Sequence, residues 1–372
     1  MQPVAQSIVP CKPRNPCIKG VVRAMSISAD ENRKKTTIKD VARLARVAPS
    51  TVSRVVAGSP RISPETHSRV RQAMEELNYH PNAIATSLAR RRTGTIGLTI
   101  SRPAEQAFAN PFFAEVIRGI GSVLHDEGYT LLLSFTQTPE EERQACLRLL
   151  RENRVDGVIL TSARVRDRLI DELQEEGYPF VLIGRVLGKR PVSWVNNDNV
   201  AVGFMATEHL IARGHRRIAL INGSRDQVVS VDRRQGYVEA MRHAGIATRP
   251  EYEVDGGFSL QGGRGAMERL LALAEPPTAV FAIDDLMALG ALIALRERGM
   301  ATGTVAVVGV NDDPLSAYLA PPLSTVRVPV FDLGATAART LMDLMVRGAA
   351  GPRRVILPAE LIVRQSSDWR LT

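Results

Sequence analysis

Short apolar runs alternate with amphipathic segments from residue 95 to residue 347, and this alternation constrains the fold more than any other feature. Strands are predicted at 96–100, 130–135, 157–160, 180–184, 218–223, 279–283 and 305–310. Helices are predicted around them, at 113–127, 140–153, 167–176, 203–213, 233–244, 286–298 and 334–347. Buried strands connected by helices form parallel, doubly wound sheets.

The alternation falls into two sets in series, residues 96–184 and 203–347. We therefore expect two similar α/β lobes within residues 94–368, with a cleft between them. In open α/β sheets, ligands bind at the carboxyl ends of the strands. A small ligand is accordingly expected in this cleft.

A different pattern precedes the lobes, since residues 35–81 predict three short helices. Apolar residues of the first helix, Val41, Ala42, Leu44 and Ala45, are expected on one face. Pro49 suits the first position of a second helix, which ends near Val56. Ser63, Pro64 and Glu65 supply a cap, a first-turn proline and an early carboxylate to a third helix. This third helix is expected to bury Val70, Met74 and Leu77.

The positive charge of the chain is concentrated next to this helical module. Residues 33–93 hold 13 Lys and Arg against four Asp and Glu, whereas residues 94–372 hold 31 against 33. A segregated basic module is typical of a polyanion-binding protein. Residues 1–34 have no periodic apolar pattern and are expected to be a disordered tail. Residues 82–93 are expected to be a linker containing a short hinge helix that orders on an anionic partner.

Polar residues crowd the start of the second helix, where Pro49 is followed by Ser50, Thr51, Ser53 and Arg54. A recognition helix of a helix-turn-helix needs such residues, because its first turns face base edges and phosphates. A purely structural helix pair would not require this cluster or the local basic surplus.

The segment from Thr36 to Ala89 resembles the DNA-binding headpiece of the lactose-repressor/galactose-repressor family of bacterial transcription regulators. Similar motifs continue through the α/β region. They are Asn110-Pro-Phe-Phe113, Gly214-His-Arg-Arg-Ile218, Arg233-x-x-Gly-Tyr237, Asp285-x-Met-Ala-Leu-Gly290, Val308-Gly309 with Asp312, and Pro321-Pro-Leu-Ser-Thr-Val326. The resemblance covers about residues 36–368.

The resemblance implies a DNA interface and an effector site. The implied DNA-contacting residues are Thr37, Ile38, Pro49, Ser50, Thr51, Ser53, Arg54, Asn82, Ala85 and Leu88. Leu88 matches the hinge leucine that inserts into the minor groove and kinks the duplex. The implied effector-binding residues are Phe112, Phe113, Arg233 and Asp285, with Arg233 and Asp285 expected to face each other across the cleft. Asp284 departs from the Asn common in the family, which leaves the preferred ligand open.

Two further departures concern the turn of the headpiece. The family usually has Gly in this turn and Ser or Thr as the cap of the recognition helix, whereas this chain has Arg46 and Ala48. An Ala cap gives up about 1 kcal/mol of helix stabilisation. Arg46 is expected at a position that requires positive φ, which adds strain.

Other functional classes lack support in the sequence. No run approaches the length of a membrane helix, and the N-terminus lacks the apolar region of a secretory signal. Three cysteines make no disulfide framework or zinc motif, so neither a metal nor a cofactor is predicted and the cytoplasm is the expected compartment. Residues Gly184–Lys189 fall one residue short of a phosphate-binding loop, and Gly223-Ser224 lacks the frame of a hydrolase elbow.

These observations predict a transcriptional regulator, specifically a repressor, and not an enzyme. It would bind a pseudo-palindromic double-stranded operator as a homodimer, under control of a small-molecule effector, expected to be a sugar. Two alternatives stay open here: a solute-binding protein with the same two-lobed core, and a sugar-modifying enzyme with a fused DNA-binding module.

Overall fold

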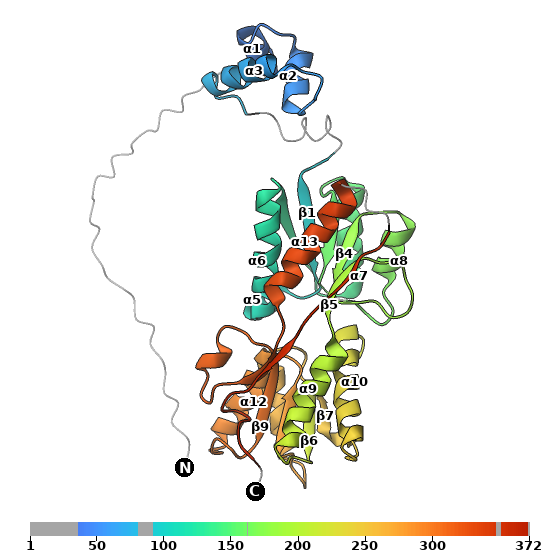
Figure 1. The fold of residues 1–372 in the computed structure, drawn as a ribbon, viewed down its shortest axis with the longest axis vertical. Coiled ribbons are helices and arrows are strands. Elements are labelled where there is room, and N and C mark those ends of the chain that lie inside the picture. Colours follow the sequence, from blue (N-terminus) through green and yellow to red (C-terminus); the bar gives the residue numbers. More distant parts are fainter. Residues whose placement is uncertain (1–35, 81–91, 162, 347–350, 371–372) are drawn as a thin grey trace, which may run out of the picture. The chain divides into compact units, whose positions relative to one another are not determined.

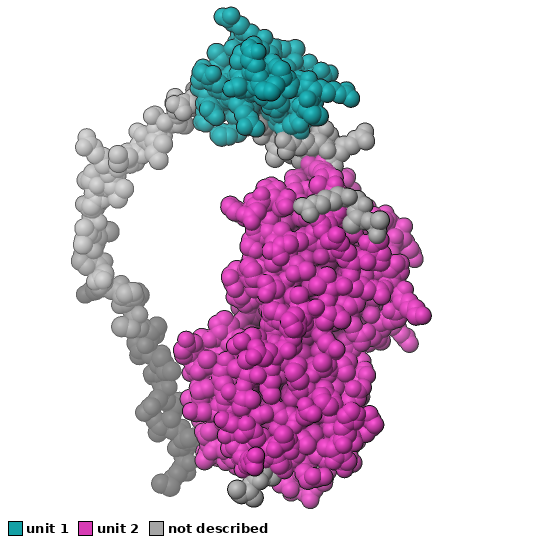
Figure 2. All heavy atoms as spheres, viewed as in Figure 1, with its two compact units in different colours: residues 1–81 teal, residues 82–372 magenta. Residues whose placement is uncertain are grey.

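The computed structural model describes residues 36–80, 92–161, 163–346 and 351–370. The chain divides into two compact units, Met1–Pro81 and Asn82–Thr372, which Figure 2 shows in different colours. The predicted tail and the predicted hinge helix lie outside the described residues. None of the described helices is long and apolar enough to cross a membrane.

The described residues of the first unit, 36–80, form three helices: α1 (Ile38–Leu44), α2 (Pro49–Val56) and α3 (Pro64–Glu76). Ser63 caps α3 as predicted, because its Oγ accepts a hydrogen bond from the N–H of Thr66 at 3.3 Å. Seven buried side chains form the core of this unit, namely Val41, Ala42, Ala45, Val52, Val55, Val70 and Ala73. Met74 and Leu77 pack against this core while partly buried. Leu44 was expected in the core but is exposed, because the buried face of α1 runs through Val41 and Ala45.

The turn between α1 and α2 has the strain that its sequence predicts. Arg46 adopts a φ of +54°, a conformation that suits glycine and costs a residue with a Cβ of the order of 1 kcal/mol. Ala48 stands at the N-cap of α2 and has no side chain to accept a hydrogen bond from the first turn. Pro49 occupies the first helical position, where no N–H is needed.

The first lobe of the second unit is a six-stranded, all-parallel sheet in the order β11-β5-β4-β3-β1-β2. Its strands are β1 (Thr95–Ile100), β2 (Thr130–Phe135), β3 (Gly157–Leu160), β4 (Phe180–Ile183), β5 (Trp194–Asn197) and β11 (Arg354–Leu357). Its helices are α5 (Ala104–Ala109), α6 (Pro111–Asp126), α7 (Pro139–Arg151), α8 (Arg168–Glu175) and α13 (Val330–Val346) (Figure 1).

Helices cover both faces of this sheet, because successive strand residues point to opposite sides. Ile159 and Val181 belong to the core beneath α6 and α13, whereas Val158 and Leu182 belong to the core beneath α7 and α8. Both faces are therefore apolar, which accounts for the continuous apolar runs in the sequence.

The second lobe has a matching sheet in the order β12-β10-β9-β8-β6-β7, parallel except for the antiparallel β10–β12 pair. Its strands are β6 (Ile218–Asn222), β7 (Glu253–Asp255), β8 (Ala279–Ala282), β9 (Ala306–Asn311), β10 (Ser324–Arg327) and β12 (Glu360–Ile362). The α-helices α9 (Asn199–Ala212), α10 (Val228–His243), α11 (Leu260–Leu271) and α12 (Asp285–Glu297) pack on it, and η1 (Pro250–Tyr252) and η2 (Ser316–Tyr318) are short 3-10 turns.

The two lobes are not built in series, which corrects the sequence-based expectation. The chain crosses between them three times: from β5 to α9, from β10 to α13, and from β11 to β12 (Figure 1). Helix α13 was assigned to the second set but packs on β3, β4 and β5 of the first lobe. Each lobe is therefore assembled from segments that are far apart in the sequence.

Glycines allow α9 and α10 to pack backbone against backbone. A Cβ added at Gly203 of α9 would lie 2.1 Å from the carbonyl oxygen of Arg233 in α10. A Cβ added at Gly236 of α10 would lie 2.0 Å from the carbonyl oxygen of Val200 in α9. This reciprocal contact, the α9–α10 interlock, sets the position of α10 relative to α9. It thereby also positions Arg233, which lies in α10.

Candidate functional site

The second helix of the first unit presents a free polar surface. Ser50 and Arg54 are exposed, Thr51 and Ser53 are half-buried, and Val52 and Val55 on the opposite side are buried. No side-chain hydrogen bond or ion pair engages the four polar residues within the described part of the chain. Donors that have no intramolecular partner at the start of a helix suit contacts with bases and phosphates.

The remaining residues that were predicted to contact DNA lie in different environments. Thr37 is exposed, and both its N–H and its hydroxyl donate to the carboxylate of Asp40, at 3.0 and 2.7 Å. Ile38 is half-buried and packs against the core of the first unit. Asn82, Ala85 and Leu88 lie outside the described residues, so their predicted role in the hinge stays a prediction.

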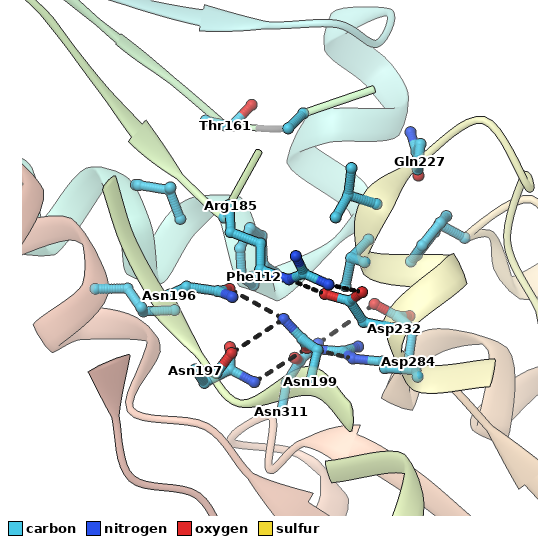
Figure 3. A pocket seen from close by; sticks show the side chains of 18 of the residues that line it. Phe112, Thr161, Arg185, Asn196, Asn197, Asn199, Gln227, Asp232, Asp284 and Asn311 are labelled. Carbon is cyan, nitrogen blue, oxygen red and sulfur yellow. Dashed lines mark hydrogen bonds and ion pairs between the residues drawn. The ribbon is translucent and has the colours of Figure 1, made fainter. Parts of the chain in front are cut away.

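The second unit contains a cavity between its two lobes, with about 880 Å³ of space that is partly open to solvent. Its lining comes from the carboxyl ends of strands in both sheets, as the fold class predicts. First-lobe residues include Arg102, Phe112, Phe113, Arg185 and Asn196, and second-lobe residues include Asp232, Arg233, Phe258, Asp284 and Asn311. Figure 3 shows part of this lining and labels, among others, Phe112, Arg185, Asn196, Asp232, Asp284 and Asn311.

Arg233 is held rigidly in the wall of the cavity. Its Nε donates to Oδ1 of Asn199 at 2.8 Å, and its Nη1 donates to the carbonyl oxygen of Ile283. Burial lowers the pKa of the guanidinium to about 10, while the nearby carboxylates of Asp284, Asp285 and Asp232 act in the opposite direction. Arg233 is therefore a fixed cation at neutral pH.

Asn199 connects this cation to two further amides. Its Nδ2 donates to Oδ1 of Asn196 at 3.0 Å, and its Oδ1 accepts from Nδ2 of Asn197 at 3.0 Å (Figure 3). All three asparagines are buried and line the cavity. Such an array of amides and a guanidinium presents mixed donors and acceptors, which is what a polyhydroxylated ligand requires.

Asp285 does not line the cavity, which corrects its predicted position. Its carboxylate is buried and accepts from Thr325 Oγ1 at 2.7 Å, Ser316 Oγ at 2.8 Å and the N–H of Asp313 at 2.9 Å. Burial raises its pKa to about 6. Asp285 and Arg233 also both belong to the second lobe, so they do not face each other across the cleft. The carboxylate of Asp285 is therefore occupied by protein donors behind the cavity lining.

The neighbouring residue, Asp284, lines the cavity where Asp285 was expected. It is the N-cap of α12, and its Oδ1 accepts from the N–H of Leu286 at 2.9 Å. Its Oδ2 accepts from Nδ2 of Asn311 at 3.3 Å and from Nδ2 of Asn110, in the first lobe, at 3.2 Å. Adjacent carboxylates in the sequence thus serve different purposes.

Several polar contacts join the two lobes. At the cavity, Asn110 donates to Asp284, and Arg185 Nε and Nη2 donate to the carboxylate of Asp232 at 2.7 and 2.5 Å (Figure 3). Bidentate pairs of this kind fix orientation as well as adding energy. Backbone hydrogen bonds from Val165 to Asp226 and from Val228 to Ala163 also connect the lobes. No role was predicted from the sequence for Asn110, Arg185 or Asp232, although Asn110 lies in the Asn110-Pro-Phe-Phe113 motif, Arg185 follows a predicted strand and Asp232 precedes Arg233.

Aromatic side chains provide the apolar part of the lining. Phe112 and Phe113 are both present, as predicted, with ring centroids 5.3 Å apart in an edge-to-face arrangement. Phe258 of the second lobe and Arg102 of the first were not predicted. In the described part of the chain, no cluster of His, Cys, Asp and Glu is arranged to hold a metal ion.

A three-helix unit with a free polar helix, joined to a two-lobed α/β unit with a polar cavity, defines a ligand-responsive DNA-binding regulator. Comparison with known families agrees. Residues 37–82 match the family described as "Bacterial regulatory proteins, lacI family", and residues 207–367 match "Periplasmic binding protein-like domain".

Relatives extend the match to nearly the whole chain. The chain is 40% identical over 339 residues to the HTH-type transcriptional regulator CelR of Thermobifida fusca, covering 90% of this chain and 99% of that protein. It resembles the solved transcriptional regulator CelR–cellobiose complex with a TM-score of 0.70 at 39% identity, covering 89% of this chain and 99% of that one. It resembles the lac repressor dimer bound to operator and an anti-inducer with a TM-score of 0.78 at 30% identity, covering 90% and 99%.

The chain therefore belongs to the lacI family of bacterial transcriptional regulators. It is a DNA-binding regulator with an effector-binding domain and not an enzyme. The family assignment over both units also excludes the two alternatives that the sequence alone left open.

Proposed function

We propose that the protein is a cytoplasmic repressor that binds a pseudo-palindromic operator as a homodimer and is controlled by a sugar in the cavity between its lobes. The observation that carries the effector site is the cavity itself, where fixed amides, a guanidinium and a carboxylate surround aromatic surfaces. The relatives support the same proposal, since one is a complex with cellobiose and another is a dimer on operator DNA.

Within the proposed site, Arg233, Asn199 and Asp284 bind hydroxyl groups, and Phe112 and Phe113 contact the apolar face of a sugar ring. Asp284 replaces Asp285 in this role because Asp284 lines the cavity. The ligand changes the alignment of the lobes and thereby the DNA affinity of the headpieces, which is a coupling free energy between two sites.

The DNA interface is proposed on α2, with Arg54 reading bases and Ser50, Thr51 and Ser53 contacting the backbone or base edges. Selection of binding sites from random duplexes should yield a two-fold symmetric sequence. Arg54→Ala should then weaken binding to this sequence by about 1–3 kcal/mol while binding to random DNA persists. Arg148→Ala, an exposed arginine of α7 in the first lobe, removes one charge outside the headpiece and is the matched control. Equal losses on selected and random DNA would show that Arg54 contacts only phosphate.

A further inference from the structure

Arg102 differs from the other charged side chains that line the cavity. Arg185, Asp232, Arg233 and Asp284 all have hydrogen-bond partners, whereas the guanidinium of Arg102 has neither a hydrogen bond nor an ion pair within the described residues. Burial lowers its pKa, against the attraction of Asp284. A guanidinium stays protonated in proteins, so Arg102 is a partly desolvated charge with unused donors.

Two aromatic rings, one from each lobe, hold this guanidinium. Its Cζ lies 4.8 Å from the ring centroid of Phe258 in the second lobe and 5.9 Å from that of Phe113 in the first. A cation–π contact uses none of the N–H donors of a guanidinium. The two rings therefore hold the side chain of Arg102 and leave its donors free for a ligand.

Phe258 adopts a strained backbone conformation. Its φ is +52°, a left-handed value that is an outlier for a bulky residue. Its ring packs so closely on Gly223 that a Cβ added there would lie 2.0 Å from a ring carbon. Strained backbone conformations are maintained only where the surrounding contacts enforce them, and they are frequent at ligand-binding sites.

We propose that Arg102 and Phe258 form a clasp, with one residue from each lobe, that holds the effector, and that Arg102 donates to two adjacent oxygens of an uncharged sugar. This inference rests on the proposed function, because it assumes that the effector binds in this cavity. The planar fork of arginine matches two neighbouring acceptors, a geometry that the single ammonium of lysine cannot reproduce. Arg102 is accordingly the residue that determines specificity.

The charges around the cavity favour an uncharged ligand. Three cations, Arg102, Arg185 and Arg233, are balanced by Asp232 and Asp284 in the lining and by Asp285 directly behind it. An anionic group on the ligand is not needed for neutrality. The phenylalanine rings offer surfaces for the C–H face of a pyranose, which a small inorganic anion would not use.

The test is calorimetry with cellobiose, maltose, glucose and the anionic cellobionate. The parent protein should bind at least one of the neutral sugars with an affinity that does not depend on NaCl. Arg102→Lys keeps the charge but loses the fork, and should weaken that binding by about ten- to a hundredfold. Phe258→Leu should weaken it about tenfold. Arg249→Lys changes an arginine that stacks on Tyr252 outside the cavity, and should bind as the parent does.

Thermal unfolding of each variant separates binding from folding, and Arg102→Gln serves if Arg102→Lys does not fold. A neutral sugar that binds Arg102→Lys as tightly as the parent overturns the clasp and leaves the proposed function intact. If the protein prefers cellobionate and its affinity falls as the salt concentration rises, the inference that the effector is uncharged is wrong, whereas the clasp itself is not refuted. A parent protein that binds none of the four compounds overturns the proposed sugar effector itself.

Discussion

Replacing Gly203 by Ala tests whether the α9–α10 interlock positions the effector site. The new Cβ would lie 2.1 Å from the carbonyl oxygen of Arg233, 2.9 Å from its C and 3.1 Å from its Cα. Since non-bonded carbon and oxygen atoms need more than about 3 Å, α10 must move away by roughly 1 Å. The same shift would lengthen the 2.8 Å bond from Arg233 Nε to Asn199 beyond hydrogen-bonding range.

Two terms set the expected loss of stability. Overpacking costs about 1–3 kcal/mol, and Ala in a helix regains about 0.5–1 kcal/mol over Gly. The net loss of about 1–2 kcal/mol should lower the melting temperature by several degrees. Affinity for the sugar that the parent binds should fall about tenfold, because one charged hydrogen bond is disturbed.

Thermal unfolding and calorimetry measure the two quantities on the same samples. Gly265→Ala in α11 is the matched control, because nothing lies within 4 Å of the added Cβ, and it should stabilise the protein by about 0.5–1 kcal/mol. If Gly203→Ala melts at or above the parent temperature and binds sugar equally well, backbone contact between α9 and α10 does not position Arg233.

Three other substitutions have distinct expected outcomes. Asp285→Ala leaves two buried hydroxyl donors and the partly buried N–H of Asp313 unpaired, and should cost about 2–4 kcal/mol in urea unfolding. Asp284→Ala should mainly reduce sugar affinity in calorimetry. Equal effects of the two substitutions on stability would contradict the separation of their roles. Partial burial and the neighbouring carboxylates of Asp285, Asp284 and Asp312 raise the pKa of Asp313, so the native state retains a proton that the unfolded chain releases above about pH 4. Stability of the parent therefore falls as pH rises across this window, and Asp313→Asn should gain at least about 1 kcal/mol at pH 8 and little at pH 4; a gain that is the same at both pH values would refute this. Arg185→Gln leaves the buried Asp232 unpaired and should cost about 1–3 kcal/mol, part of which Asp232→Asn should restore in the double variant; additive losses in the double-mutant cycle would show that the two residues are not coupled.

Local chemistry made the headpiece predictable. The Arg46 turn with positive φ, the Ser63 cap and the first-turn prolines each depend on neighbours within a few residues, and all agree with the structure. The strong strands were also found within one residue, because a doubly covered sheet leaves long apolar runs. Short polar strands such as β5, with sequence WVNN, carry no such signal and were missed.

The features that the sequence did not predict depend on contacts between segments that are far apart in the chain. Sequence order suggested that α13 belongs with the second lobe, but no local pattern records where the chain crosses back. Asp284 and Asp285 have the same chemistry and adjacent positions, and only the orientation of the α12 N-terminus decides which one faces the cavity. Similarly, the stacking of Arg102 on Phe258 joins residues that are far apart in the chain, so no motif could reveal it.

The threefold crossing of the chain between lobes has a consequence for biosynthesis. The headpiece has its own core within residues 36–80 and is synthesised first, so it can fold while the rest of the protein is still being translated. The first lobe cannot follow in the same way. The helix that covers Ile159 and Val181, and the edge strand β11, come from residues 330–357, after nearly all of the second lobe.

The second lobe is in turn incomplete until β12, at residues 360–362, has been made. Both lobes therefore present apolar sheet surface until residues 330–362 have been made. Apolar surface that stays exposed during synthesis makes a partly folded chain prone to aggregation. Loss of residues 330–362 would remove α13 and β11 from the first lobe and β12 from the second, whereas the core of the headpiece lies within residues 36–80.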